Sequence, residues 1–512
     1  MVYLILLFSI LFLFLAWRRL DWAVMFLIAA LPAYLIRFNI LGLPATLLEA
    51  MIWIVFIVWF LKNYGYIIEN LKFKIVNCKL KIDNRYPFDW EIVLLLFIAL
   101  LAASVAGFSN SSFGIWKAYF FEPALFFIVV LNVLYGDKGR EKILWALAVS
   151  ALAVSFLAIY QKITGQLIGN PVWAASQTRR VVSFFGYPNA VGLYLGPLIL
   201  IFTGWLMHVM ASVNEAISQS EKNHKLQAPS PKQITSTKPQ TNYKHQAPNK
   251  EFVWKLGFGI WNLKAIFINL TIILSILSIY FAKSKGALLG ITAGLIVFGF
   301  LAGKKIRWAM IALIIIMAIG LATYQPAWQK TFKYLTLNDF SGQVRRAQWR
   351  ETWQMLKDGR LITGAGLANY RHSVALYHTE GIFFNKDNDP DFRRKIVLFN
   401  HEYKKKFWQP LEIYLYPHNI ILNFWSELGL AGMLLFIWII FKYFYLGIFN
   451  FQFSIFNEFS MNKFLIIGLI SAMIAIIIHG LVDVPYFKND LAVMFWLLVA
   501  MMSMINFEKK YF

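Results

Sequence analysis

Long apolar segments are the feature that most constrains how this chain of 512 residues can fold. Roughly thirteen of them are long enough to cross the hydrocarbon core of a bilayer, which takes about 17–25 residues of helix. Inside lipid the backbone N–H and C=O groups have no water partner, so such segments fold as helices. We predict spans near residues 2–17, 22–38, 41–61, 90–107, 118–136, 143–161, 190–211, 264–282, 286–302, 307–323, 419–446, 463–480 and 490–506.

Composition supports the same class of protein. Hydrophobic residues make up 59% of the chain and charged residues only 15%. No soluble domain needs so large a share of apolar residues. The predicted fold is therefore all-α, a polytopic membrane protein with about 12–13 transmembrane helices. The first apolar segment has no basic region or small-residue cleavage site before it ends at Arg18, so we expect a retained anchor. The single cysteine, Cys78, excludes an intramolecular disulfide.

The distribution of basic residues predicts the orientation of the chain in the membrane. Lysine and arginine in short loops favour the cytoplasmic side. With the N-terminus outside, the cytoplasmic side receives Arg18 and Arg19, residues 72–85, residues 138–142, residues 304–307, and Lys509 with Lys510. The formal net charge of +23 is then explained by topology and by attraction to anionic lipid. We expect no nucleic-acid partner, because the chain has no soluble basic fold.

Two long connections differ in composition. Residues 212–263 fall on the cytoplasmic side, and residues 213–250 are so rich in Ser, Gln, Lys, Asn and Pro that we predict a disordered linker. Residues 324–417 fall outside and carry many aromatic side chains, some of them at helical spacing. We expect this external loop to be partly folded and to cap the membrane helices. The predicted domains are 1–211, 212–263, 264–323, 324–417 and 418–512.

Basic residues on the predicted external side oppose the charge rule, so they are candidates for an anion-binding site. Arg179 and Arg180 precede a turn that ends at Asn189 and opens a span, and the arginine fork suits a diphosphate. Lys283 and Lys285 share a tight turn between two spans. For each of these cations the alternative role is anchoring at the membrane interface.

The external loop adds a basic and aromatic helix face. Arg346, Arg350 and Trp353 are spaced at i, i+4 and i+7, which places them on one side of a helix. Such a face can bind phosphate and stack on a sugar ring, or it can be a solvated face above a packed tryptophan. Nearby glycines permit close backbone approach, and Arg371 and His372 after them are ligands or surface residues.

Two polar pairs lie at the mouths of late spans. His418 and Asn419 begin the eleventh span, and Glu427 follows about two turns later. Histidine at a helix start can serve as a base, or as a cap that only makes hydrogen bonds. His479 and Asp483 are four residues apart at the outer end of the twelfth span. Ionisable groups at membrane depth are usually paired or functional.

Glu122, in the fifth span, belongs with these ionisable groups. We predict no metal site, because the chain has no HExxH motif and no Cys/His cluster. A Walker loop and a glycine-rich loop after a strand are also missing from the sequence, so ATP and NAD chemistry are unsupported.

Four of these clusters resemble the O-antigen ligase/polymerase superfamily in the order that the family has them. The resemblance covers roughly residues 170–500 and departs from the family at Lys285, where an arginine is usual and the bidentate fork is lost. The matching residues are Arg180 with Pro188 and Asn189; Ser284, Lys285 and Gly286; Arg346 with Trp349 or Trp353, Gly364 and Gly366; and His418 and Asn419 with Glu427, Gly429 and Gly432. His479 and Asp483 resemble a late His/Asp pair of the family.

The resemblance implies a GT-C-like fold and an enzyme that needs no metal or cofactor. It would transfer glycan from an undecaprenyl-diphosphate donor to a glycan, lipid or protein acceptor, at the external face of the cytoplasmic membrane. His418 would be the general base, and Glu427 or Asp483 would orient it or stabilise its cation. The expected donor or glycan ligands are Arg179, Arg180, Asn189, Lys283, Lys285, Arg346, Arg350, Arg371, Asn419 and His479.

Two alternatives stay open. Protein O-oligosaccharyltransferases share these motifs, so the sequence leaves the acceptor undetermined. A transporter or flippase of lipid-linked saccharides is the alternative from another class. It would be expected to have broken helices at mid-membrane and paired repeats, and it gives no reason for a folded external loop.

Overall fold

The structure is a computed structural model that describes residues 2–40, 43–76, 87–227, 250–398, 401–456 and 462–507. These residues are mainly helical, and their β structure consists of two short antiparallel strand pairs. Among them, nine helices are long and apolar enough to cross a membrane, and three shorter apolar helices accompany them. The prediction of an all-α, polytopic membrane protein is confirmed.

The first part of the chain forms the N-terminal helices and one hairpin. Its elements are α1 (Val2–Arg18), α2 (Leu20–Ala29), the 3₁₀ turn η1 (Leu31–Leu35), β1 (Arg37–Ile40), β2 (Leu43–Thr46), α3 (Leu47–Val76), α4 (Asp89–Val105), α5 (Asn110–Trp116), the π-helical turn η2 (Lys117–Phe121), α6 (Glu122–Val133), α7 (Gly136–Thr164), α8 (Pro171–Ala174), α9 (Pro188–Gln227) and α10 (Lys250–Ala282).

The second part holds the long loop and the C-terminal helices. Its elements are α11 (Lys285–Ala302), α12 (Lys304–Thr323), α13 (Gln325–Leu335), α14 (Phe340–Met355), the turn η3 (Leu356–Arg360), α15 (Tyr370–Val374), the 3₁₀ turn η4 (Ala375–Tyr377), β3 (Gly381–Phe383), α16 (Phe392–Val397), α17 (His401–Phe407), β4 (Trp408–Pro410), α18 (Ile420–Phe456), α19 (Lys463–Gly480) and α20 (Asn489–Phe507).

The predicted spans 22–38 and 41–61 are wrong at the two ends that adjoin in sequence. Helix α2 ends at Ala29, and residues 37–40 pair antiparallel with residues 43–46 as β1 and β2, which we call the β1–β2 hairpin. Pro32 opens the 3₁₀ turn, where its missing N–H cannot continue an α-helix. Pro44 sits in β2, a position that proline tolerates at the edge of a sheet.

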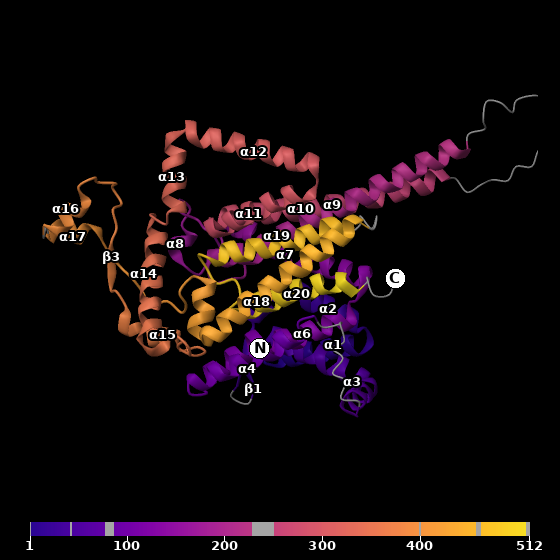
Figure 1. Cartoon of the computed structure of the whole chain (residues 1–512), viewed down its shortest axis with the longest axis horizontal. Coiled ribbons are helices and arrows are strands. Elements are labelled where there is room, and N and C mark those ends of the chain that lie inside the picture. Colours follow the sequence, from indigo (N-terminus) through magenta and orange to yellow (C-terminus); the bar gives the residue numbers. More distant parts are fainter. Residues whose placement is uncertain are drawn as a thin grey trace, which may run out of the picture.

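The predicted cytoplasmic linker begins inside a helix. Helix α9 continues to Gln227, and α10 begins at Lys250, so residues 213–227 are helical. Residues 228–249, where the rest of the predicted disorder falls, lie outside the described residues. Figure 1 shows α9 and α10 running together beyond the other helices at one end of the bundle.

Helix α19 lies at the centre of the C-terminal bundle and packs against α9, α11 and α18. Small residues let these backbones approach closely. A Cβ added to Gly204 of α9 would lie 3.0 Å from the Cα of Gly468 in α19. A Cβ added to Gly290 of α11 would lie 2.7 Å from the carbonyl oxygen of Ala475. This tight packing fixes the helix ends from which the site residues project.

The long connection between α12 and α18 is folded, as expected, and lies at the end of the bundle opposite to the α9–α10 extension (Figure 1). Some of the basic residues that we predict on the cytoplasmic side lie close together, near the starts of α2, α7 and α19. Lys142 pairs with Asp21 at 2.6 Å, and Arg140 donates to the Asn462 side chain at 3.3 Å. The fold therefore separates these basic residues from the loop.

Candidate functional site

A break in α18 positions the site on that helix. Gly429 has φ 73° and ψ −177°, which interrupts the helical backbone. The loop that precedes α15 enters this break: Leu430 N–H donates to Ile362 O at 3.0 Å, and Ala365 N–H donates to Ser426 O at 2.6 Å. Backbone groups freed by the break are thus satisfied by the loop rather than left unpaired.

The Gly-x-Gly sequence of this loop is explained by close backbone contacts. Gly364 and Gly366 have φ values of 67° and 85°. A Cβ on Gly364 would lie 2.6 Å from Ser426 O in α18, and one on Gly366 would lie 2.9 Å from Ala102 O in α4. The loop is therefore wedged between α4 and α18, where only glycine fits.

The same loop fixes Glu427. Ala368 N–H donates to Glu427 Oε2 at 2.7 Å, and the Glu427 side chain is buried. This carboxylate therefore faces the large cavity described below.

His418 lies just before α18 in a strained conformation, with φ 45°. Its Nδ1 is 3.1 Å from the side-chain oxygen of Gln348 in α14, and its ring packs edge-on against Tyr414 and Tyr416. With Nδ1–H donating to Gln348, the ring lone pair is on Nε2. Burial lowers the pKa of His418, and Arg345 adds to this effect against the opposing charge of Asp483. The imidazole is therefore suited to accept a proton.

Asp483 lies between α19 and α20 and is buried. Its Oδ2 accepts a hydrogen bond from Asn189 Nδ2 at 3.2 Å. Burial alone would raise the pKa of Asp483, but the charges of His418, His479 and Arg345 hold it below its ordinary value. A carboxylate that stays ionised thus lies among three basic groups.

Three further predicted residues join this group. Arg180 Nη2 donates to Asn189 Oδ1 at 3.4 Å, so Asn189 links Arg180 to Asp483. His479 is buried beneath the turn that starts α11: a Cβ on Gly286 would lie 2.6 Å from His479 Cδ2. The structure thus brings together five of the predicted site residues. We call the central cluster the set Arg180, Asn189, Arg345, Gln348, His418, His479 and Asp483.

Sequence reasoning missed Arg345 and Gln348 of α14. Arg345 acts electrostatically on His418, His479 and Asp483, and Gln348 contacts His418 directly. Within the described residues, Arg345 Nε and Gln348 Nε2 are buried donors without a hydrogen-bond partner. The available signal was the three-residue spacing of Arg345 and Gln348, which places them on one helix face.

Arg346 and Arg350 lie outside the central cluster. With Gln343, Trp349 and Trp353 they line a separate cavity of about 650 Å³, and Ile382 of β3 completes it. Arg346 also donates to the Asn338 side chain at 2.9 Å. The predicted basic and aromatic face therefore exists, but it does not face His418.

Two predicted ligands contact backbone carbonyls. Arg179 donates to the carbonyl oxygens of Lys162, Ile163 and Ala174, which ties the end of α7 to α8. Lys283 donates to Thr178 O at 3.5 Å. These contacts join neighbouring loop segments, and the roles predicted for Arg179 and Lys283 stay predictions.

Lys285 and Asn419 also have local partners. Lys285 Nζ is 3.1 Å from Asp339 Oδ2 and 3.6 Å from the ring centroid of Tyr334. Asn419 Oδ1 accepts from the N–H groups of Ile421 and Leu422 at 3.0 Å, so it caps α18.

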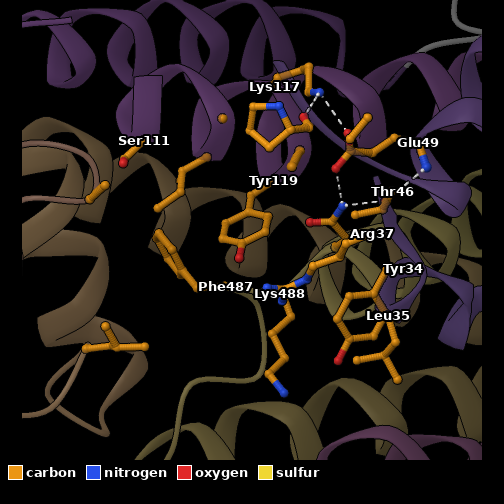
Figure 2. Close-up of a pocket in the computed structure, with 18 of the residues that line it drawn as sticks. Tyr34, Leu35, Arg37, Thr46, Glu49, Ser111, Lys117, Tyr119, Phe487 and Lys488 are labelled. Carbon is orange, nitrogen blue, oxygen red and sulfur yellow. Dashed lines mark hydrogen bonds and ion pairs between the residues drawn. The ribbon is translucent and has the colours of Figure 1, made fainter. Parts of the chain in front are cut away.

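A larger cavity, of about 880 Å³, lies between the β1–β2 hairpin, α5 and the segment before α20 (Figure 2). We call it the hairpin cavity. Predicted site residues Glu427 and Arg371 line it, together with the unpredicted charged residues Arg37, Glu49, Lys117 and Lys488. Glu122 lies behind this region and accepts a hydrogen bond from Trp53 Nε1 at 2.9 Å.

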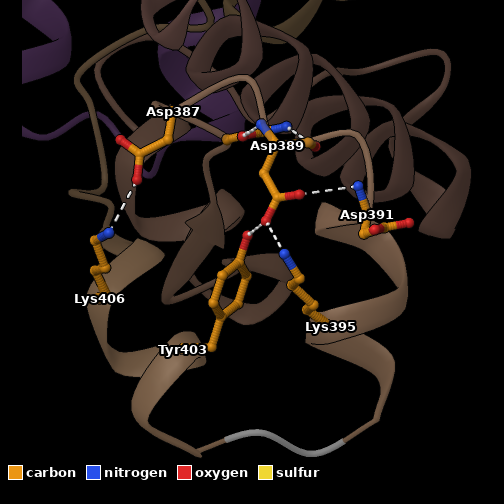
Figure 3. A network of polar contacts seen from close by, with 7 residues as sticks. Asp387, Asp389, Asp391, Lys395, Tyr403 and Lys406 are labelled. Carbon is orange, nitrogen blue, oxygen red and sulfur yellow. Dashed lines mark hydrogen bonds and ion pairs between the residues drawn. The ribbon is translucent and has the colours of Figure 1, made fainter.

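The prediction of no metal site assumed that the chain has no DxD motif, and this was wrong, because the sequence contains an Asp-x-Asp-x-Asp run at Asp387, Asp389 and Asp391. In the structure its Asp389 accepts hydrogen bonds from Lys395 and Tyr403, and Asp387 pairs with Lys406 (Figure 3). These contacts join α16 to α17. The acidic run therefore has a structural explanation as a set of ion pairs in the folded loop.

Comparison with protein families finds that residues 270–437 match the O-antigen ligase family. A search of curated proteins finds no match. The matched segment contains Lys285, Arg345, Gln348, His418 and Glu427, whereas Arg180, Asn189, His479 and Asp483 lie outside it. The match supports the resemblance to the O-antigen ligase superfamily, and this chain is an all-α, polytopic membrane protein whose residues 270–437, which we call the O-antigen ligase domain, are similar to that family.

Proposed function

We propose that the chain transfers glycan from an undecaprenyl-diphosphate donor to an acceptor, and that the reaction takes place at the central cluster. The O-antigen ligase domain supports a ligase-type function in general. The observation that carries the finer proposal is the pairing of a base with an anion-binding environment. His418 and Asp483 lie next to the two buried donors, Arg345 Nε and Gln348 Nε2, which have no partner in the described part of the chain.

The proposed reaction follows from this arrangement. Nε2 of His418 accepts the proton of an acceptor hydroxyl, and the hydroxyl oxygen attacks the anomeric carbon of the donor sugar. The bond between that carbon and the diphosphate oxygen breaks, and undecaprenyl diphosphate leaves with the bonding electrons. Arg345 and Arg180 stabilise the charge that develops on the diphosphate. Asp483 stabilises the protonated His418.

The proposed location is the external face of the cytoplasmic membrane. The central cluster lies at the end of the bundle that carries the folded loop, and the basic residues near the starts of α2 and α7 lie at the other end (Figure 1). The positive-inside rule favours placing the basic end in the cytoplasm. This supports an external site that receives a lipid-linked donor from the outer leaflet.

The test is a transfer assay with purified protein in nanodiscs, lipid-linked glycan and candidate acceptors. We expect His418→Gln, which keeps a hydrogen bond but not a base, to lower the transfer rate by about 10²-fold or more. His401→Gln changes an exposed histidine of α17 and should transfer normally. Near-normal transfer by His418→Gln would show that His418 is not the base.

The acceptor is identified in cells. We expect a deletion strain to accumulate the lipid-linked glycan and to lack the glycan on one class of surface acceptor, as measured by mass spectrometry. Unchanged lipid-linked and surface glycans would contradict the proposed function as a whole.

A further inference from the structure

The hairpin cavity is built mostly by parts of the chain outside the O-antigen ligase domain. The β1–β2 hairpin, α5 and the turn η2 form one wall, and Phe487 and Lys488 form another (Figure 2). Only Ala368, Arg371, Leu415, Tyr416 and Glu427 come from the domain itself. The cavity therefore adds features of this chain to the region near the central cluster.

Three cations of this cavity lack a carboxylate partner. Lys117 pairs with Glu49 at 2.7 Å, but among the described residues Arg37, Arg371 and Lys488 form no ion pair. Arg37 and Arg371 are exposed at the cavity, and Lys488 is less exposed and lies 4.0 Å from the ring centroid of Tyr187. The cavity therefore carries positive charge that an anionic ligand would neutralise.

Arg37 and Lys488 line the same cavity. Burial lowers the pKa of Lys488, and the charge of Arg37 adds to this effect, although the carboxylates Asp490 and Asp483 oppose it. Two like charges in a partly buried site cost free energy unless an anion lies between them. Figure 2 shows both side chains among the residues that line the cavity.

The remaining lining suits a sugar ring. Tyrosines 34, 119, 187 and 416 provide aromatic faces, while Asn39, Asn110 and Ser111 provide donors and acceptors for hydroxyl groups. A volume of about 880 Å³ accommodates an organic ligand rather than a single ion. The lining thus combines the apolar and polar contacts that a saccharide requires.

The cavity is also next to the proposed reaction centre. Tyr416 lines the cavity and lies 6.1 Å, between ring centroids, from His418. Tyr187 lines it and precedes Asn189, the residue that contacts Asp483, by two positions. A ligand in the cavity can therefore place one end near the base.

We propose that the hairpin cavity is a subsite for an acidic saccharide, a sugar unit whose carboxylate or phosphate lies between Arg37 and Lys488. The proposal rests on the proposed function, because it makes this unit part of the transferred or accepting glycan. Arg371 attracts the anion at the opening of the cavity. The tyrosines stack on the sugar ring.

The test measures binding rather than transfer. Saturation-transfer NMR on the full chain in nanodiscs uses D-glucuronate and D-glucose as separate probes, and inorganic diphosphate as a competitor of glucuronate. We expect glucuronate to bind at least about tenfold more tightly than glucose, because it adds charge-assisted hydrogen bonds. Arg37→Gln and Lys488→Gln should each weaken glucuronate binding about tenfold, and Lys488→Arg should retain it.

Controls separate the possible failures. Lys330→Gln removes an exposed lysine of α13 and should bind glucuronate normally. Arg371→Gln, at an exposed position, should also weaken binding, which covers the case in which Lys488→Gln does not fold. Equal binding of glucose and glucuronate would overturn the proposal. Competition between inorganic diphosphate and glucuronate that depends on Arg37 and Lys488 would also overturn the proposal. That result would assign the cavity to the diphosphate headgroup of the donor.

One further variant distinguishes this proposal from the proposed function. His418→Gln should bind glucuronate as tightly as the unchanged chain, because His418 does not line the cavity. Normal binding with lost transfer supports both proposals. Normal binding with normal transfer supports the subsite and contradicts the role of His418. Loss of glucuronate binding in His418→Gln, with the protein still folded, would overturn the separate subsite.

Discussion

At the scale of single residues, the rotation of α14 about its axis decides which arginine serves the central cluster. Arg345 and Gln348 face His418 and Asp483, whereas Arg346 and Arg350 face a second cavity. Neighbouring arginines in a helix point about a quarter of a turn apart, so only one of them can serve the cluster. In the proposed reaction, α14 therefore contributes Arg345, and not Arg346, to charge stabilisation at the leaving diphosphate.

We expect Arg345→Gln to lower the transfer rate by about 10²-fold, the usual effect of removing one donor that stabilises a developing negative charge. Arg346→Gln, the matched change one residue later, should lower it far less. Initial rates with both variants in nanodiscs measure the difference. A larger loss for Arg346→Gln than for Arg345→Gln would place the diphosphate in the second cavity instead.

Burial is the main cause of the lowered pKa of His418, and the charge of Arg345 adds to it. His418 acts as a base only when neutral, so transfer is lost as the pH falls through its pKa. Arg345 lowers this pKa, so Arg345→Gln should raise it and shift the acidic limb of the pH–rate profile to higher pH. The residual activity of Arg345→Gln measures this shift. If the acidic limb of Arg345→Gln lies at the same pH as that of the unchanged protein, Arg345 does not influence the pKa of His418.

The sequence predicted five members of the central cluster but not the other two. His418, His479, Asp483, Asn189 and Arg180 could be found because each departs from the charge or polarity expected at a membrane span. The spacing of Arg345 and Gln348 places them on one helix face, but they lie in a polar loop where such residues are ordinary, and the sequence does not show how α14 is rotated. The spacing of Arg346, Arg350 and Trp353 predicted a helix face that exists, but it did not show which face of α14 meets His418.

At the scale of elements, the junction between α18 and the loop before α15 holds the site together. Gly429 adopts φ 73° and ψ −177°, a region that is essentially restricted to glycine. A Cβ at this position would lie 2.3 Å from Ile362 O. The junction also brings Ala368 to Glu427.

We expect Gly429→Ala to lower the free energy of unfolding by about 1–3 kcal/mol, from backbone strain alone. Undocking of the loop should also reduce transfer. Gly320→Ala in α12 is the control, since a Cβ there meets nothing within 4 Å and alanine favours a helix. Thermal unfolding in nanodiscs measures both variants. Equal melting temperatures would indicate that the loop adapts to a side chain.

The lengths of the apolar segments predicted the long helices correctly, but they did not predict the β1–β2 hairpin. Long helices such as α7 and α19 agree with their predicted spans, because lipid-length apolar runs permit few other folds. Residues 37–46 are also largely apolar, so length alone extended the spans through them. Pro32 and Pro44 were the available signals against a helix there.

At the scale of the whole molecule, the site gathers segments that are far apart in sequence. The hairpin cavity combines residues near positions 37, 117, 371 and 488, and the central cluster combines residues from 180 to 483. No spacing rule connects such positions, so the cavity could not be predicted. What the sequence does predict at this scale is orientation, because basic residues mark one side of the membrane.

That orientation gives the last prediction. In a Cys78→Ser background, a cysteine at Asn388 should react in intact cells with a thiol reagent that cannot cross the membrane, because Asn388 lies in the loop at the site end of the bundle. A cysteine at Ser230, in the stretch outside the described residues, should react only after the cells are permeabilised. The positive-inside rule is the physical reason. Labelling of Ser230→Cys but not Asn388→Cys in intact cells would reverse the topology. It would put the central cluster in the cytoplasm, where an external lipid-linked donor could not reach it.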